Sequence, residues 1–310
     1  MFSLIFPGQG SQSVGMGRDL YSNYTYIKAL FDQADETLGF KLSQIILEGP
    51  KEDLDLTEYT QPAIFLVSYS IFTNIKKETG IDFLKAKYFA GHSLGEYSAL
   101  AAAESLGFEK VLSLLNKRGK AMQMSVPKGK GGMIAVLGAK LEDINQLLIE
   151  NEKKYKCYIA NDNSNGQIVV SGLVDDLNLM VDDLTKKSIK NIKLAVSAPF
   201  HSPLMHKASE IMENEINNTK FSSPKNNIIS NVNANEANNV ETIKKLLIKQ
   251  IESPVRWRES VLYMKENGVK KFIEIGPGKV LSGLIKRIDK SLITLSINSL
   301  DDTTNLNLDD

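Results

Sequence analysis

A serine stands at the centre of a segment that could form a covalent intermediate. Residues 91–95 read G-H-S-L-G, which is the pattern G-x-S-x-G with Ser93 in the middle. In this pattern a sharp turn between a strand and a helix projects the serine hydroxyl, and the glycines allow the tight backbone. The amide of Leu94, at the start of the helix, can donate to a developing oxyanion. The segment predicts nucleophilic catalysis by Ser93; the alternative is a glycine-rich turn that happens to contain a serine.

A serine nucleophile needs a base, and histidine is the usual one. The chain has three histidines, His92, His201 and His206. Adjacent side chains on a sharp turn point apart, so His92 is expected to brace the turn. His206 falls on an expected helix and is predicted to be a surface residue. His201 lies on a proline-punctuated loop after an expected strand, where catalytic groups collect in α/β folds. By elimination it is the candidate base, against the alternative of a structural histidine.

Arg118 is the third residue that could take part in the chemistry. On the helix expected over residues 108–124, Val111, Leu115 and Met122 lie seven and three positions before it and four after it, and so share its face. An arginine in an apolar stripe either extends to the helix edge or meets an anion in a crevice. Spacing alone leaves both alternatives open. If an anion is met, the forked guanidinium suits a carboxylate.

The elements around these residues predict an α/β fold. Short apolar runs at residues 4–6 and 88–90 are expected to be buried strands. Helical apolar spacing predicts helices over residues 26–38, 62–78, 94–103 and 108–124. Strands that alternate with helices favour a mostly parallel sheet.

The stretch 127–198 has a pattern of its own. Strands are expected at residues 133–137, 155–160, 167–171 and 192–196, with helices at 141–151 and 173–188 and a hairpin turn across 161–166. The order β-α-β-β-α-β is that of a ferredoxin-like subdomain. We therefore expect this subdomain to be inserted into a discontinuous core made of residues 1–126 and 199–310.

Composition excludes several other classes of protein. The 310 residues carry 37 Lys+Arg and 37 Asp+Glu, so the net charge is zero, which argues against a dedicated nucleic-acid binder. At 42% hydrophobic the chain can bury a sizeable core. The single cysteine, Cys157, forms no internal disulfide and no metal cluster. No membrane-spanning run or signal peptide is expected, and the predicted location is the cytoplasm.

Six motifs in the same order resemble the malonyl-CoA:acyl-carrier-protein transacylases of fatty-acid synthesis. They span nearly the whole chain and read FPGQGSQ (6–12), YTQPA (59–63), GHSLGEYSAL (91–100), PFHSPLM (199–205), SPVRW (253–257) and EIGPG (274–278). The resemblance implies an α/β-hydrolase-like core with a ferredoxin-like insert, which agrees with the pattern of elements.

Residue roles follow from the same resemblance, motif by motif. Ser93 looks like the nucleophile and His201 like its base. Gln9 would supply a second oxyanion amide beside that of Leu94. Arg118 matches the arginine that holds the malonyl carboxylate, and this match favours the anion alternative.

Four further residues are assigned by the resemblance alone. Gln250 falls where a main-chain carbonyl orients the histidine, in place of the carboxylate of a triad. Phe200 is predicted to contact substrate, and it stands where relatives have a smaller residue. Lys190 and Lys193 lie where relatives use basic residues near the phosphates of coenzyme A.

The implied reaction is ping-pong transfer of a malonyl group from malonyl-CoA to the phosphopantetheine thiol of acyl carrier protein. We expect no cofactor and no metal, no nucleic-acid or membrane partner, and a monomer. Two alternatives remain: a serine hydrolase or thioesterase of similar fold, and a non-catalytic docking subunit. The fate of a malonyl group on Ser93 separates these three functions.

Overall fold

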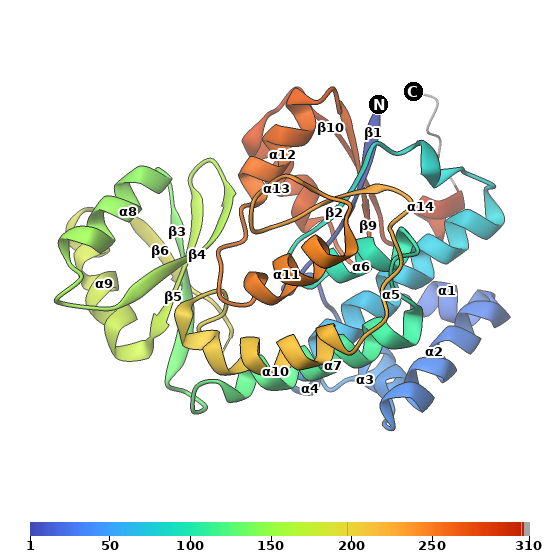
Figure 1. Cartoon of the computed structure of the whole chain (residues 1–310), viewed down its shortest axis with the longest axis horizontal. Coiled ribbons are helices and arrows are strands. Elements are labelled where there is room, and N and C mark those ends of the chain that lie inside the picture. The colour runs from blue at the N-terminus through green and yellow to red at the C-terminus, as the bar shows by residue number, and fades with distance from the viewer. Residues whose placement is uncertain (197, 305, 307–310) are drawn as a thin grey trace.

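The computed structural model describes residues 1–196, 198–304 and 306, which form two sheets with helices around them (Figure 1). The larger sheet has the strand order β10-β9-β1-β2-β7-β8, and its neighbours are parallel except for β7 and β8. Its strands are β1 (Phe2–Phe6), β2 (Tyr88–Gly91), β7 (Asn227–Ile229), β8 (Glu236–Ala237), β9 (Lys271–Ile275) and β10 (Ile293–Ile297).

Helices cover both faces of this sheet because its strands are apolar on both sides. Successive side chains of a strand point to opposite faces. Leu4 and Phe6 of β1 join one hydrophobic cluster, and Ile5 joins another. The first cluster includes α5 (Thr57–Glu78), α6 (Gly95–Ala102) and α7 (Phe108–Met124), and the second includes α12 (Trp257–Glu266) and α13 (Val280–Ile288). The other helices are α1 (Arg18–Asn23), α2 (Thr25–Leu38), α3 (Leu42–Glu48), α4 (Lys51–Leu54), α10 (His206–Asn217), α11 (Val240–Gln250) and α14 (Leu300–Thr304).

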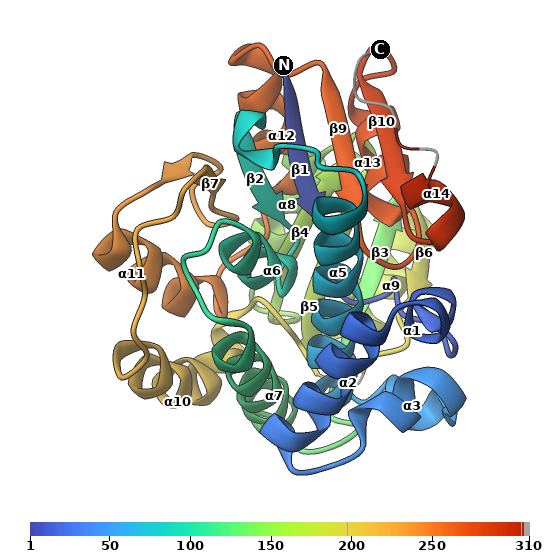
Figure 2. The ribbon, with the colours of Figure 1, turned by 90° about the vertical axis from the view of Figure 1, so that its right-hand side faces the viewer.

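The second sheet is antiparallel and lies beside the first (Figure 1). Its strand order is β4-β5-β3-β6. It is built from β3 (Gly131–Leu137), α8 (Leu141–Glu150), β4 (Cys157–Ser164), β5 (Gln167–Leu173), α9 (Val174–Lys186) and β6 (Lys190–Lys193). Strand β4 attaches it to the larger unit, because Val255 bonds Ala160 and Asp162 through its backbone at 2.8 and 2.9 Å. In the view of Figure 2 the small sheet lies behind α5, α6 and α7.

The predicted α/β class with a mostly parallel sheet is confirmed, and a separate antiparallel sheet accompanies it. The largest error in an expected helix boundary is at α5, which begins at Thr57, not at Pro62; the other expected helices begin and end within two residues of expectation. Proline lacks an N–H, so the carbonyl of Glu58 loses its helical donor. The side chain of Asn116 on α7 replaces that donor at 3.0 Å, which lets the helix continue through the proline. Within the described ranges, no helix is long and apolar enough to cross a membrane.

The largest differences from expectation in the small sheet are at the β4–β5 turn and at β6. The turn between β4 and β5 is only Asn165-Gly166, with a φ of 73° at Gly166, because Asn-Gly suits a two-residue hairpin. Two irregularities in the register of β4 absorb the extra residues that were expected to form the turn. Strand β6 spans Lys190–Lys193 instead of the expected 192–196. Leu194 still donates its N–H to the carbonyl of Met133 on β3 at 3.0 Å, and residues 194–196 line a pocket.

Candidate active site

Ser93 occupies a sharp turn between β2 and α6. Its φ of 54° is left-handed, which is unfavourable for a residue with a side chain. A Cβ at Gly91 would lie 1.9 Å from the carbonyl carbon of Gly95, and a Cβ at Gly95 would lie 2.2 Å from the carbonyl oxygen of Phe6. Only glycine fits at both positions. The packing of the turn against β1 thus explains the G-x-S-x-G spacing and aims the serine hydroxyl into a pocket.

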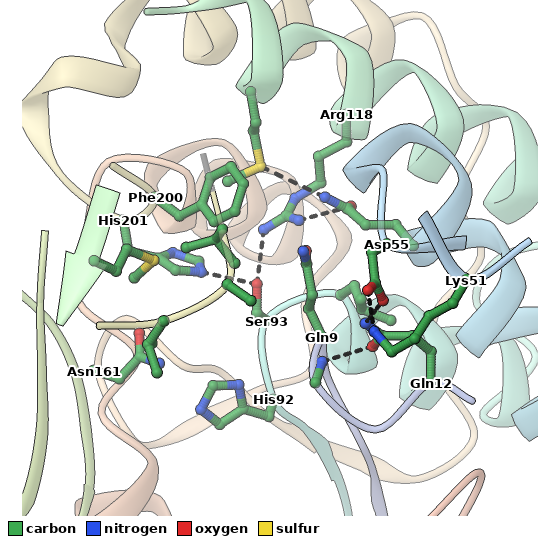
Figure 3. Close-up of a pocket in the computed structure, with 18 residues that line it drawn as sticks. Gln9, Gln12, Lys51, Asp55, His92, Ser93, Arg118, Asn161, Phe200 and His201 are labelled. Atoms are coloured by element: carbon green, nitrogen blue, oxygen red, sulfur yellow. Dashed lines mark hydrogen bonds and ion pairs between the residues drawn. The ribbon is translucent and has the colours of Figure 1, made fainter. Parts of the chain in front are cut away.

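His201 lies next to this hydroxyl, in the segment before α10. Its Nε2 is 2.8 Å from Ser93 Oγ (Figure 3). Its Nδ1 is 2.9 Å from the main-chain oxygen of Gln250, the last residue of α11. A carbonyl oxygen can only accept, so Nδ1 carries the proton and donates it to Gln250. The lone pair of Nε2 therefore faces the serine hydroxyl, as a general base requires.

The environment of His201 keeps its imidazole neutral. The ring is buried, and burial lowers the pKa of His201 from 6.5 to about 3, with the positive charge of Arg118 as the next cause. The hydrogen bond to Gln250 opposes the shift and does not cancel it. At neutral pH the imidazole is thus unprotonated and able to accept a proton.

Arg118 is buried, with 1% of its surface exposed, and its guanidinium lies beside the nucleophile. Nη1 donates to Gln61 Oε1 at 2.8 Å, and Nη2 donates to Gln250 Oε1 at 2.9 Å and to Ser93 Oγ at 3.1 Å. Gly119 allows this approach of α7 to α5, since a Cβ there would lie 2.5 Å from the carbonyl oxygen of Thr57. The side chain does not extend to the helix edge; it presents a fixed positive charge next to Ser93.

The three groups open onto a pocket of about 450 Å³ between the two sheets. Gln9, Leu94 and Phe200 line it with them, so most of the predicted site residues meet there. Lys190 and Lys193 do not line it: they lie on β6, whose continuation through residues 194–196 forms one wall. In the described part of the chain, no group of three or more His, Cys, Asp or Glu residues is placed to hold a metal ion.

Two backbone amides at this pocket are available to donate hydrogen bonds to a negatively charged oxygen. The loop that carries Gln9 packs against the turn, and a Cβ at Gly8 would lie 2.6 Å from the carbonyl oxygen of His92. Neither the Gln9 amide nor the Leu94 amide donates a hydrogen bond to any described residue. The amide of Ser93 itself is engaged, because it donates to Asn231 Oδ1 at 2.7 Å.

Several supporting residues were not identified from the sequence. Gln61 and Glu96 stand inside the quoted motifs, so a signal for them existed, but nothing indicated their partners. Asn231 lies in a segment without any chemical pattern. His92, expected to brace the turn, bonds Asn163 Oδ1 through Nε2 at 2.8 Å, and that asparagine comes from β4 of the small sheet.

Comparison with known proteins agrees with this geometry. The family model described as acyl transferase domain matches residues 3–298, so the chain belongs to the acyl transferase family. The malonyl CoA-acyl carrier protein transacylase of Bacillus subtilis (strain 168) is 42% identical over 298 residues, which cover 96% of this chain and 93% of the relative. Within the family the chain therefore belongs with the malonyl CoA-acyl carrier protein transacylases.

Solved structures extend this similarity to three dimensions. An acyl-carrier-protein-S-malonyltransferase from Bartonella henselae superposes with a TM-score of 0.95 at 38% identity, covering 98% of this chain and 97% of the other. A malonyl-transacylase in complex with a type II PKS acyl-carrier protein superposes with a TM-score of 0.93 at 35% identity, with the same coverage of both chains.

Proposed function

We propose that this enzyme transfers the malonyl group of malonyl-CoA to the phosphopantetheine thiol of acyl carrier protein, through a malonyl ester on Ser93, and so supplies the extender unit for fatty-acid synthesis. One observation carries the proposal: a base and a fixed cation converge on one hydroxyl. His201 Nε2 lies 2.8 Å and Arg118 Nη2 lies 3.1 Å from Ser93 Oγ. A nucleophile, its base and a partner for the malonyl carboxylate are then within reach of one small acyl group.

In the first half-reaction His201 takes the proton of Ser93 Oγ as that oxygen attacks the thioester carbonyl carbon. Negative charge develops on the carbonyl oxygen, and the amides of Gln9 and Leu94 stabilise it. The C–S bond then breaks, and the thiolate of coenzyme A leaves with the proton that His201 returns. The acyl group remains as an ester on Ser93.

The second half-reaction repeats these steps with a different thiol. The phosphopantetheine thiol of the carrier protein gives its proton to His201 Nε2 and attacks the ester carbon. The bond to Ser93 Oγ breaks, and the serine recovers the proton from His201. The main-chain oxygen of Gln250 holds the imidazole in one tautomer throughout, as the carboxylate of a triad does elsewhere.

Selection of the substrate is proposed to divide between two regions. Arg118 binds the malonyl carboxylate, since its planar fork matches two carboxylate oxygens. Phe200, whose carbonyl accepts a hydrogen bond from Ser171 Oγ, limits the space beside the acyl group. Lys190 and Lys193 attract the phosphates of coenzyme A from the exposed strand β6, outside the pocket.

We further propose that residues 127–198 are a ferredoxin-like subdomain inserted into an α/β-hydrolase-like core of residues 1–126 and 199–310. The strand order β4-β5-β3-β6, with α8 and α9 between strands, supports this division. The proposed enzyme acts in the cytoplasm, as a monomer and without a cofactor. The last two points are supported by one chain supplying every group that the two half-reactions use.

The test is a two-step labelling experiment. Malonyl-CoA labelled in the malonyl group is mixed with the enzyme, the labelled peptide is mapped, and holo-acyl carrier protein is then added. We expect label on Ser93 that moves to the carrier, and no label on the Ser93→Ala variant. Rapid loss of label to water would instead indicate a hydrolase, and no labelling of the native chain would indicate a docking subunit.

A further inference from the structure

We propose that Asn231 is a positioning residue that holds the strained turn at Ser93 and leaves the Leu94 amide as the turn's oxyanion donor. The inference rests on the proposed function, because it concerns the rate at which Ser93 is acylated. Asn231 follows β7, far from Ser93 in the sequence, and its side chain is completely buried.

Asn231 spans the turn with both ends of its amide group. Its Oδ1 accepts the N–H of Ser93 at 2.7 Å, and its Nδ2 donates to the carbonyl oxygen of Gly91 at 2.7 Å. These two backbone groups lie on either side of His92, at the point where the chain enters the left-handed conformation. Tying them to one planar amide fixes the turn, and with it the direction of Ser93 Oγ toward His201.

The same contact determines which amide can meet an oxyanion. In some serine enzymes the amide of the nucleophile itself donates to the oxyanion. Here that amide is engaged by Asn231, whereas the Leu94 amide has no acceptor among the described residues. Loss of Asn231 would release the Ser93 amide and allow the turn to relax, so that neither hydroxyl nor oxyanion donor would stay in place.

Asn231 is also connected to the groups that hold the base and the cation. Its backbone N–H donates to Glu96 Oε2 at 3.0 Å, and the same oxygen accepts Nε2 of Gln250 at 2.8 Å. Gln250 in turn bonds His201 through its main-chain oxygen and Arg118 through its side chain. Burial raises the pKa of Glu96 to about 7, which reflects how completely this network is closed to water.

The opposite end of β7 offers a matched control. Asn226, just before the strand, is also buried and donates through Nδ2 to the carbonyl oxygen of Ala86 at 3.0 Å. It supports the chain before β2, and its hydrogen-bond partners among the described residues, the carbonyls of Phe83, Leu84 and Ala86, lie outside the site. Asn226→Ala and Asn231→Ala therefore remove comparable buried amides, but only the second removes contacts to the turn.

The first experiment measures acylation of Ser93 by rapid quench with labelled malonyl-CoA in both variants. We expect Asn231→Ala to acylate about 100-fold more slowly than Asn226→Ala, because small displacements of reacting groups cost about this much. The KM for malonyl-CoA should change less than about threefold, since Gln61 still bonds Arg118. Equal acylation rates in the two variants, at similar melting temperatures, would overturn the inference.

A second variant keeps the test decisive if Asn231→Ala does not fold. Asn231→Asp preserves the shape, and a protonated carboxyl presents the same acceptor and donor as the amide. Once ionised it still accepts from Ser93 but repels the carbonyl of Gly91. Four charged or titratable residues surround this position. Glu96 accepts the N–H of Asn231, and the backbone N–H of Arg256, just before α12, donates to the carbonyl of Asn231. Arg118 and His201 are connected to it through Gln250, whose Nε2 also donates to Asn231 Oδ1.

We expect Asn231→Asp to acylate Ser93 at least about tenfold more slowly than the native enzyme at pH 9, where the new carboxyl is ionised. A rate within about twofold of the native rate at pH 9 would overturn the inference. Failure of the proposed function is a separate result, because it would show as absence of label, or loss of label to water, in the native enzyme itself.

Discussion

The two sides of the pocket are built in different ways. On the side of the large sheet, Ser93, His201 and Arg118 are tied to one another and to buried partners by hydrogen bonds. On the side of the small sheet, residues 194–196 are apolar, and Asn161 Oδ1 is buried without a partner among the described residues. The first side is arranged before substrate arrives, which suits chemistry. The second side offers the substrate an apolar surface and an unpaired hydrogen-bond acceptor, which suits selection between substrates.

Removal of the base, His201, is expected to cause the largest loss of rate. His201→Ala should lower the rate of malonyl-serine formation about 10⁴-fold, because among the described residues the other partner of Ser93 Oγ is Arg118, which cannot accept a proton. Rapid-quench labelling measures this rate. His206→Ala is the matched control, since that histidine is exposed and pairs with Glu252, and its effect should stay below about twofold. If His201→Ala lowered this rate only slightly, His201 would be excluded as the general base.

The cation gives the next largest effect. Arg118→Ala should lower the rate of malonyl transfer about 100-fold and that of acetyl transfer less than about tenfold. Only the malonyl group carries a carboxylate whose contact with Arg118 would be lost. Comparing kcat/KM for the two acyl-CoA substrates checks this. Lys117→Ala on the same helix, exposed and paired with Glu215, should change neither value by more than about twofold. Equal losses for both substrates would exclude Arg118 as the carboxylate partner.

The pH dependence follows from the lowered pKa of His201. A base with the ordinary pKa of 6.5 would be about 30-fold less available at pH 5 than at pH 8. With a pKa near 3 in the native enzyme, His201 stays neutral over this range, so the acylation rate should change less than about twofold between pH 8 and 5. Rapid quench at several pH values measures it. A 30-fold fall would show that the imidazole is hydrated, not buried.

Selection beside the acyl group should show a smaller effect. Phe200→Ser enlarges the pocket, and the hydrogen bond from Ser171 to the main chain keeps the backbone in place. We expect kcat/KM for methylmalonyl-CoA, relative to malonyl-CoA, to rise about tenfold, the order expected for one methyl group. An unchanged ratio would show that a residue other than Phe200 limits the size of the acyl group.

The exposed lysines should have the smallest effect. Lys190→Ala combined with Lys193→Ala should raise the KM for malonyl-CoA about threefold at low salt, with kcat unchanged, because exposed charges are screened. The rise should disappear at high salt. Lys110→Ala, exposed on α7, serves as the control. A fall in kcat would mean that the lysines affect a chemical step, which would contradict the assignment of chemistry to the large-sheet side alone.

Local pattern was sufficient for much of the fold. The helix over residues 108–124 was predicted with its observed bounds, since its apolar spacing is regular and no breaker interrupts it. The start of α5 was missed because Pro62 normally marks a boundary, and a side chain from another helix was needed to carry the helix past it. The β4–β5 turn was misplaced because irregular register in a strand has no clear signature in the sequence.

For the site, the sequence by itself determined the chemical types and the turn: glycines at 91 and 95 dictate a tight backbone, and Ser93 is the residue it projects. The tertiary structure decided the rest. Gln61 and Asn231 act on Arg118 and Ser93 across 57 and 138 positions of the chain. Such partners leave no periodicity or spacing to detect, because their contact depends on where parallel strands and packed helices bring their ends together.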